Sequence, residues 1–195
     1  MTKSLKFLML FVIAALLVVG SVSANNNDDV TLEYVMAVGD YYDYNYEYVN
    51  KVLNTYVSSE ELPVVFYVAQ SANVEPEEIA KMRSDKNSWM DIASSYSLSP
   101  KVFYVMMAGK TKNAEFQATF EKYHSVLASQ WDKIDLTDQE VVNLVNLRFI
   151  YKKQGYDPFE IMSMQAYGKS YVNIFHSIGE LKEELLDRDM AAKGK

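Results

Sequence analysis

An internal repeat constrains the fold of this chain more than any other feature of its sequence. Residues Val74–Ile92, VEPEEIAKMRSDKNSWMDI, align without a gap with Tyr156–Ile174, YDPFEIMSMQAYGKSYVNI. Six of the nineteen positions are identical, where ordinary composition gives roughly one chance match. The identical positions are Pro76/Pro158, Glu78/Glu160, Ile79/Ile161, Met82/Met164, Ser88/Ser170 and Ile92/Ile174. Such a repeat indicates a supersecondary unit that buries its apolar face against a neighbouring copy.

Each copy carries the signals of two helices joined by a short turn. The prolines of the repeat suit the first position of a helix, where a backbone N–H is not needed. Asp157 suits the N-cap of the second copy, with Glu160 three residues on as its partner in a capping box. The serines suit the N-cap of the helix that follows the turn. The repeat therefore predicts an all-α fold, a compact bundle or array of repeated helix-turn-helix pairs, with copies at about 61–97 and 143–179.

Helical periodicity and cap signals cover most of the remaining chain. By pattern the apolar run Glu61–Ala72 fits a buried strand or a buried helix, and its place directly before the repeat favours a helix. Thr137 with Glu140 predicts a capping box ahead of a further apolar helix. Two more helices are expected from apolar spacing. The short one includes Phe103, Met106 and Met107, and the long one carries Phe116, Phe120, Tyr123 and Leu127 on one face.

A single domain accounts for the helical part of the chain. We expect residues 31–190 to form one all-helical repeat domain, since this length is sufficient for one sizeable core. A degenerate third copy over 38–62 is a further hypothesis, because Ser58 falls on the serine of the repeat and around three units usually close such a core. The last helix is expected to fray after Leu186, leaving 191–195 as a frayed tail.

The N-terminus has the three parts of a secretory signal. Lys3 and Lys6 precede the uncharged apolar stretch Phe7–Val19, and small residues for cleavage follow. This predicts a cleaved signal peptide at 1–24 and a flexible spacer at 25–30. The alternative is an uncleaved membrane anchor, but the apolar stretch is shorter than the roughly 20 residues that span a bilayer. We therefore expect an exported protein, periplasmic or secreted.

The chain is acidic and has no cysteine. Its formal net charge is −7. Without Lys3 and Lys6 the predicted mature chain has 17 basic and 26 acidic residues, a net charge of −9. Such a surface keeps a protein soluble and repels nucleic acid and anionic lipid at long range. The lack of cysteine excludes both a lipoprotein anchor and disulfides, so the core alone must hold the fold.

The segment Asp40–Tyr48, DYYDYNYEY, departs from the helical pattern. Its alternating tyrosines are typical of a strand, but the sequence offers no partner strand, which favours a loop leading into a helix at about Tyr46. Exposed tyrosines beside carboxylates can stack on sugar rings or grip a peptide. The alternative is that these rings pack between helices. The candidate partner-binding residues are Tyr41, Tyr42, Tyr44 and Tyr46.

Two resemblances bear on the architecture. The stretch VEPEEIAKMR followed by SWMDIA is similar to the helix-turn-helix pairs of bacterial DNA-binding proteins. Electrostatics disfavour that function, because Arg83 and Lys86 have Gln165 and Gly168 as their counterparts in the second copy. The region Glu61–Val105, with ELPVVFYVAQ and SPKVFYV, resembles small uncharacterised exported bacterial proteins with repeated helix pairs. That resemblance implies a helical architecture and no particular activity.

No catalytic constellation stands out in the sequence. There is no cysteine nucleophile, and neither His124 nor His176 has the i, i+4 companion of a zinc-binding helix. The sequence also lacks a phosphate loop, a dinucleotide fingerprint and a Gly-x-Ser-x-Gly elbow. Ten methionines raise copper binding, but their helical spacing favours a role as core filler. We therefore expect no catalytic residue, no metal site and no cofactor.

These observations predict an exported, noncatalytic helical repeat protein, a protein-, peptide- or glycan-binding or structural module of the cell envelope. The alternative is a cell-wall hydrolase of lysozyme-like type, which needs one carboxyl kept protonated in an apolar pocket. Glu77 and Glu78 are better explained as first-turn charges that favour a helix. A helix-turn-helix nucleic-acid binder is a minor alternative if the chain is not exported. We expect an envelope partner, no nucleic acid and no transmembrane span in the mature chain.

Overall fold

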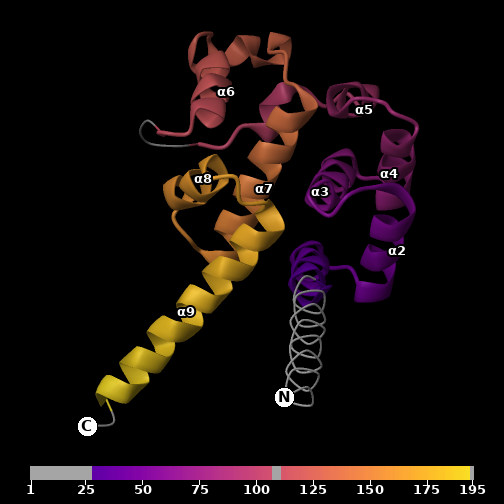
Figure 1. Cartoon of the computed structure of the whole chain (residues 1–195). Helices are drawn as coiled ribbons and strands as arrows, with labels where there is room; N and C mark the ends of the chain where they lie inside the picture. Colours follow the sequence, from indigo (N-terminus) through magenta and orange to yellow (C-terminus); the bar gives the residue numbers. More distant parts are fainter. Residues whose placement is uncertain (1–27, 107–110, 194–195) are drawn as a thin grey trace, which may run out of the picture.

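The computed structural model describes residues 28–106 and 111–193, and these are arranged entirely as helices and connecting turns (Figure 1). The described elements are a helix over residues 28–42, α2 (Tyr46–Tyr56), α3 (Leu62–Ala72), α4 (Pro76–Ser84), α5 (Trp89–Ser95), the 3₁₀ helix η1 (Pro100–Phe103), α6 (Ala114–His124), the 3₁₀ helix η2 (Ala128–Lys133), α7 (Asp138–Gln154), α8 (Pro158–Ala166) and α9 (Tyr171–Lys193). The predicted all-α fold class is confirmed. The predicted signal peptide, 1–24, lies outside the described residues. Among the helices described, none combines the length and apolar character needed to cross a bilayer.

Helix α7 is the centre of the fold. It contacts α3, α5, α6, α8 and α9, and Figure 1 shows it between the α2–α4 side and the α6–α8 side of the molecule. It begins at the predicted capping box, in which Thr137 accepts from the Glu140 N–H and the Glu140 carboxylate accepts from the Thr137 N–H. Apolar residues on almost every side of α7 are buried, as they are on α3. The core therefore lies where α3 packs against α7.

The pairs α4–α5 and α8–α9 share three local features. Proline occupies the start of α4 and of α8. The Ser88 hydroxyl accepts from the Asp91 N–H at 3.0 Å, and the Ser170 hydroxyl accepts from the Asn173 N–H at 3.2 Å. Left-handed backbone recurs at positions 82 residues apart. These positions are Asn73 with Gly155 and Lys86 with Gly168.

The two helix pairs are joined by a reciprocal exchange of carboxylates. Asp138, at the start of α7, accepts from the Trp89 N–H of α5 at 2.7 Å. Glu60, just before α3, accepts from the Tyr171 N–H of α9, also at 2.7 Å. Arg83 binds Asp138 as well, at 2.6 Å. A negative group at a helix N-terminus satisfies an otherwise unpaired N–H and the helix dipole. Each half of the chain thereby completes a helix of the other.

Two predicted helix boundaries are wrong at the C-terminal side. Helix α6 ends at His124 because the Trp131 indole N–H donates to the Tyr123 carbonyl at 2.9 Å. A continued helix would have offered that carbonyl to the Leu127 N–H, and Leu127 is 72% exposed instead of facing the core. Helix α9 does not fray after Leu186 but runs to Lys193. Ion pairs one turn apart, such as Arg188 with Glu184, support its exposed part.

Two further predictions are corrected near the N-terminus and after η1. Residues 28–30, assigned to the flexible spacer, already form the first turn of a helix. The short helix at Pro100 is a 3₁₀ helix that ends at Phe103. Met106 therefore lies beyond it and is 85% exposed, although its spacing had placed it in the core. Met107 lies outside the described residues.

Candidate functional site

Two of the four candidate tyrosines are packing residues of the core. The ring of Tyr41 makes an edge contact with Phe149, with 5.4 Å between the ring centroids. Tyr42 is only 7% exposed and stacks on Phe66 at 5.8 Å. Burial raises the pKa of the Tyr42 hydroxyl well above its usual range, so this group stays neutral. The alternative interpretation, in which these rings pack between helices, therefore holds for Tyr41 and for Tyr42, apart from the small exposed part of Tyr42.

The other two tyrosines are closer to solvent. Tyr44 is half-buried in the turn after the helix of residues 28–42 and stacks on Tyr48 at 5.2 Å. Tyr46 is the first residue of α2, as the sequence predicted, and is exposed. Tyr42 and Tyr44 line a cavity of about 400 Å³, called the tyrosine cavity below. Tyr41 and Tyr46 do not line it, so the four tyrosines do not form one surface.

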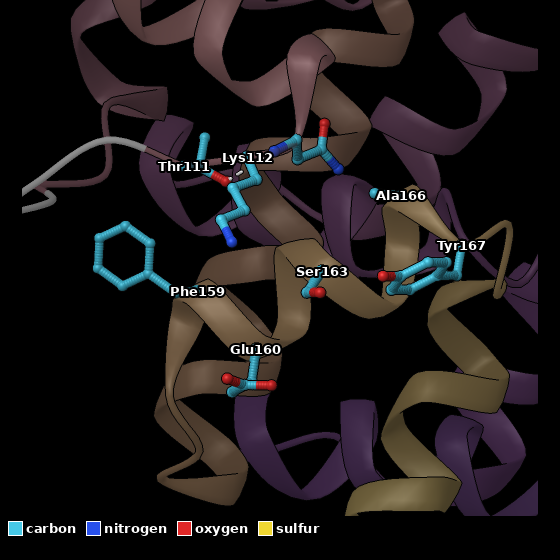
Figure 2. Close-up of a pocket in the computed structure, with 8 residues that line it drawn as sticks. Thr111, Lys112, Phe159, Glu160, Ser163, Ala166 and Tyr167 are labelled. Carbon is cyan, nitrogen blue, oxygen red and sulfur yellow. Dashed lines mark hydrogen bonds between the residues drawn. The ribbon is translucent and has the colours of Figure 1, made fainter.

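A second cavity lies on α8 and reaches Tyr167, in the turn where the two repeat segments differ in sequence. It has a volume of about 450 Å³ and is called the α8 cavity below (Figure 2). Its lining residues are Thr111, Lys112, Asn113, Phe159, Glu160, Ser163, Ala166 and Tyr167. Most of them lie on α8 or at its end, and the others come from the segment just before α6. Residues some 50 positions apart in the sequence therefore share this site.

One face of α8 forms the longer wall of the α8 cavity. Phe159, Ser163 and Ala166 are spaced four and three residues apart, which places them on one side of a helix. Tyr167 follows directly and is 87% exposed. In Figure 2, Phe159 and Tyr167 stand at the two ends of this face, with Ser163 between them. Small side chains in the middle and aromatic rings at the ends leave room for an extended ligand.

Asn113 holds the second wall against α8. Its side chain is 3% exposed and donates to the Met162 carbonyl at 2.8 Å and to the Gln165 side chain at 2.6 Å. Its oxygen accepts from the Glu115 and Phe116 N–H groups, so it also caps α6. The sequence shows an asparagine before a helix, which predicts the cap. It does not show the contact with α8, and that contact fixes the position of Lys112.

The α8 cavity carries one uncompensated charge of each sign. None of the ion pairs within residues 28–106 and 111–193 involves Lys112 or Glu160. Figure 2 shows Lys112 extending toward α8. The predicted capping box between Asp157 and Glu160 is not formed, because Asp157 accepts from the Phe159 N–H at 2.7 Å. The Glu160 carboxylate therefore remains available to a ligand.

The two histidines lie outside both cavity linings. The Nδ1 of His176 lies 2.6 Å from Glu33, which ties α9 to the helix of residues 28–42. His124 is exposed in the last turn of α6. Within the part of the chain that the structure describes, no three histidine, aspartate or glutamate side chains are placed to share a metal ion. The residues that line the two cavities can bind a ligand by ring stacking, hydrogen bonding and charge pairing.

Comparisons with known proteins add no assignment to this geometry. No protein-family model matches the chain, and no curated protein or solved structure matches it either. Function must accordingly be inferred from the residues that line the two cavities.

Proposed function

We propose that this chain is an exported, noncatalytic helical repeat protein that binds short peptides in the α8 cavity. The observation that carries the proposal is the combination of an almost fully exposed tyrosine with unpaired charges of both signs around one cavity. An exposed large aromatic side chain next to a hollow is typical of a binding surface. Small-ligand sites commonly have volumes of roughly 300–1,000 Å³, and this cavity falls within that range.

The charges favour a peptide over a neutral glycan. A short peptide with free termini carries one ammonium and one carboxylate group, which match Glu160 and Lys112 respectively. The hydroxyls of Ser163 and Tyr167 can pair with peptide N–H and C=O groups. Ala166 offers little side-chain bulk, so a ligand backbone can approach the helix closely. A neutral oligosaccharide would use the rings and hydroxyls but would leave both charges uncompensated.

The similarities and differences between the two helix pairs support different roles for them. Matching prolines, serine caps and left-handed residues suggest that both helix pairs follow one building plan. The turns differ, with Asp85-Lys86-Asn87 in the first copy and Tyr167-Gly168-Lys169 in the second. Because Tyr167 stands in the turn that differs, we infer that the shared residues form scaffold and that the second copy was adapted for binding.

Export places this activity in the cell envelope, where short peptides and wall fragments are at hand. The proposal depends on the N-terminal signal, which lies outside the described residues. N-terminal sequencing of the secreted or periplasmic protein should begin at Asn25. A full-length cytoplasmic product would contradict export and would reopen the nucleic-acid alternative.

Peptide titrations test the proposed function directly. Isothermal titration of the mature chain with Ala-Phe-Ala, free at both ends, should give binding about tenfold tighter than its acetylated and amidated form, because two surface ion pairs contribute roughly 0.2–1 kcal/mol each. Tyr167→Ala should weaken binding of the free peptide. Tyr151→Ala, which removes an exposed tyrosine outside the cavity, is the matched control. Equal affinity for the blocked peptide, or tighter binding of a neutral chitin oligosaccharide, would refute the peptide assignment.

Particular contacts argue against the two alternative functions. Glu160 is exposed, whereas a lysozyme-like acid must be kept in an apolar pocket. Arg83, a cation of α4, is already bound to Glu61 at 2.7 Å and to Asp138 at 2.6 Å, which leaves it poorly placed for a phosphate. Peptidoglycan zymography and a DNA mobility shift should both be negative, and clearing of the gel would favour the hydrolase.

A further inference from the structure

The tyrosine cavity joins two connections that are distant in the sequence. Tyr42 ends the helix of residues 28–42 and Tyr44 lies in the turn before α2, and both line the cavity opposite the connection between α3 and α4. Around them the cavity is lined by Ala69, Gln70, Asn73, Val74 and Glu75. Two aromatic rings, two side-chain amides and one carboxylate thus surround a volume of about 400 Å³. This site lies between the end of the helix of residues 28–42 and the end of α3, whereas the α8 cavity lies on α8.

The tyrosine wall is held in place by close backbone contacts. The Tyr44 N–H donates to the Gly39 carbonyl at 2.9 Å, across the left-handed residue Asp43. A Cβ at Gly39 would come within 2.7 Å of the Tyr44 carbonyl oxygen, so only glycine allows this approach. A wall that is fixed before a ligand arrives loses little conformational entropy on binding.

The opposite wall is fixed in a similar manner. Asn73 ends α3 in the left-handed conformation, and the Val74 N–H donates to the Ala69 carbonyl at 3.1 Å. These bonds turn the chain so that Gln70, Asn73 and Glu75 border one hollow. Both walls are therefore preorganised by hydrogen bonds that a ligand does not need to form.

The electrostatics of this cavity favour a positive ligand. No ion pair within the described residues involves Glu75, whereas Glu77 is paired with Lys51 at 2.6 Å. Burial first, and then the Glu75 carboxylate, raise the pKa of the Tyr44 hydroxyl. The Tyr44 ring therefore lies within the negative field of an uncompensated carboxylate.

Arg148 is a cation that acts on one wall of the cavity. Burial raises the pKa of Tyr42 and the Arg148 charge lowers it by less, so Arg148 lies within electrostatic reach of that ring. Its guanidinium donates to the Val102 and Tyr104 carbonyls and lies over the Tyr67 ring at 4.6 Å. Arg148 keeps its positive charge, but its guanidinium is not among the groups that line the cavity, and the net charge of −7 attracts cations to the molecule as a whole.

We propose that the tyrosine cavity binds an organic ammonium group, held by the ring of Tyr44 and by the carboxylate of Glu75, with the largely buried Tyr42 as part of the wall. Aromatic rings attract a cation placed against them, and a carboxylate adds a charge pair. An anionic ligand would meet the Glu75 carboxylate in a cavity whose lining contains no lysine or arginine. This site is separate from the α8 cavity, so the inference does not rest on the proposed peptide binding.

Choline and its neutral isostere 3,3-dimethyl-1-butanol provide the test, since they share shape and differ in charge. Isothermal titration of the mature chain should show choline binding about tenfold tighter than the alcohol. The cation–π contact and the surface ion pair, which the neutral alcohol cannot make, together account for roughly this difference in affinity. Equal affinities for the two compounds, or no detectable choline binding, would overturn the proposal.

Four variants locate the binding. Tyr44→Phe keeps the ring and should bind choline like the wild type, while Tyr44→Ala should weaken binding about threefold. Glu75→Gln replaces an exposed side chain, so folding is preserved, and should weaken choline binding roughly threefold without affecting the alcohol. Tyr167→Ala alters only the α8 cavity and should leave choline affinity unchanged. If Glu75→Gln and Tyr44→Ala both bind choline like the wild type, the site is wrong.

Discussion

Replacement of Asn113 should separate its two roles, as the cap of α6 and as the clamp that holds Lys112 beside α8. Asn113→Ala removes both sets of bonds, whereas Asn113→Ser keeps a capping oxygen and loses the donors to Met162 and Gln165. An N-cap contributes about 1 kcal/mol, and each neutral hydrogen bond contributes roughly 0.5–1.5 kcal/mol. The alanine variant should therefore lose about 3 kcal/mol of unfolding free energy, and the serine variant about 2 kcal/mol.

Urea unfolding followed by circular dichroism measures these losses, with a control at a second cap. Ser88→Ala removes a cap that makes no clamp contact and should lose only about 1 kcal/mol. In thermal melts, a loss of 3 kcal/mol in a chain of this size corresponds to roughly 6–12 °C. The clamp interpretation is refuted if Asn113→Ser is as stable as the wild type while Asn113→Ala loses only the value of a cap.

Three further predictions concern the scaffold. Lys86→Gly should stabilise the protein by up to about 1 kcal/mol, and Gly168→Ala should destabilise it by about the same amount, because both residues are left-handed and only glycine adopts that conformation without strain; urea midpoints measure both. Asp138→Ala should lose roughly 2–3 kcal/mol, since the Trp89 N–H loses a charged acceptor, and tryptophan fluorescence should report this unfolding together with circular dichroism. Burial would raise the pKa of Glu140, but bonds from Lys122 and from the capping backbone lower it below its ordinary 4.5. The ionised Glu140 carboxylate therefore stabilises the fold above pH 4.5, and this stabilisation is lost as the pH falls through the lower folded pKa. Glu140→Gln should reduce the decrease in unfolding free energy that urea unfolding measures below pH 4.5.

Local signals in the sequence were sufficient for much of the architecture. The capping box at Thr137, the start of α2 at Tyr46 and the helical state of Glu61–Ala72 are all found in the structure. Each depends on contacts within a few residues or on the apolar pattern of one segment. Such features are determined by propensity and capping chemistry, which a single sequence displays directly.

Features that depend on distant residues were not predictable. The end of α6 is set by Trp131, whose indole takes the carbonyl that helix continuation requires. The α8 cavity depends on Asn113 meeting Met162, 49 residues away, and no local pattern announces that contact. The tyrosines were found as a cluster, but whether each ring packs inward or lines a cavity is decided by the helices around it.

The exchange of carboxylates between the halves has a consequence for how such a chain can change over time. Glu60 accepts from the Tyr171 N–H of α9, in the other half of the chain. Asp138 likewise accepts from the Trp89 N–H of α5. A substitution at either acid therefore removes a hydrogen bond from a helix of the other half of the chain. The turns of the two helix pairs can vary independently, but a chain that lost Glu60 or Asp138 would leave a helix N–H of the opposite half unsatisfied.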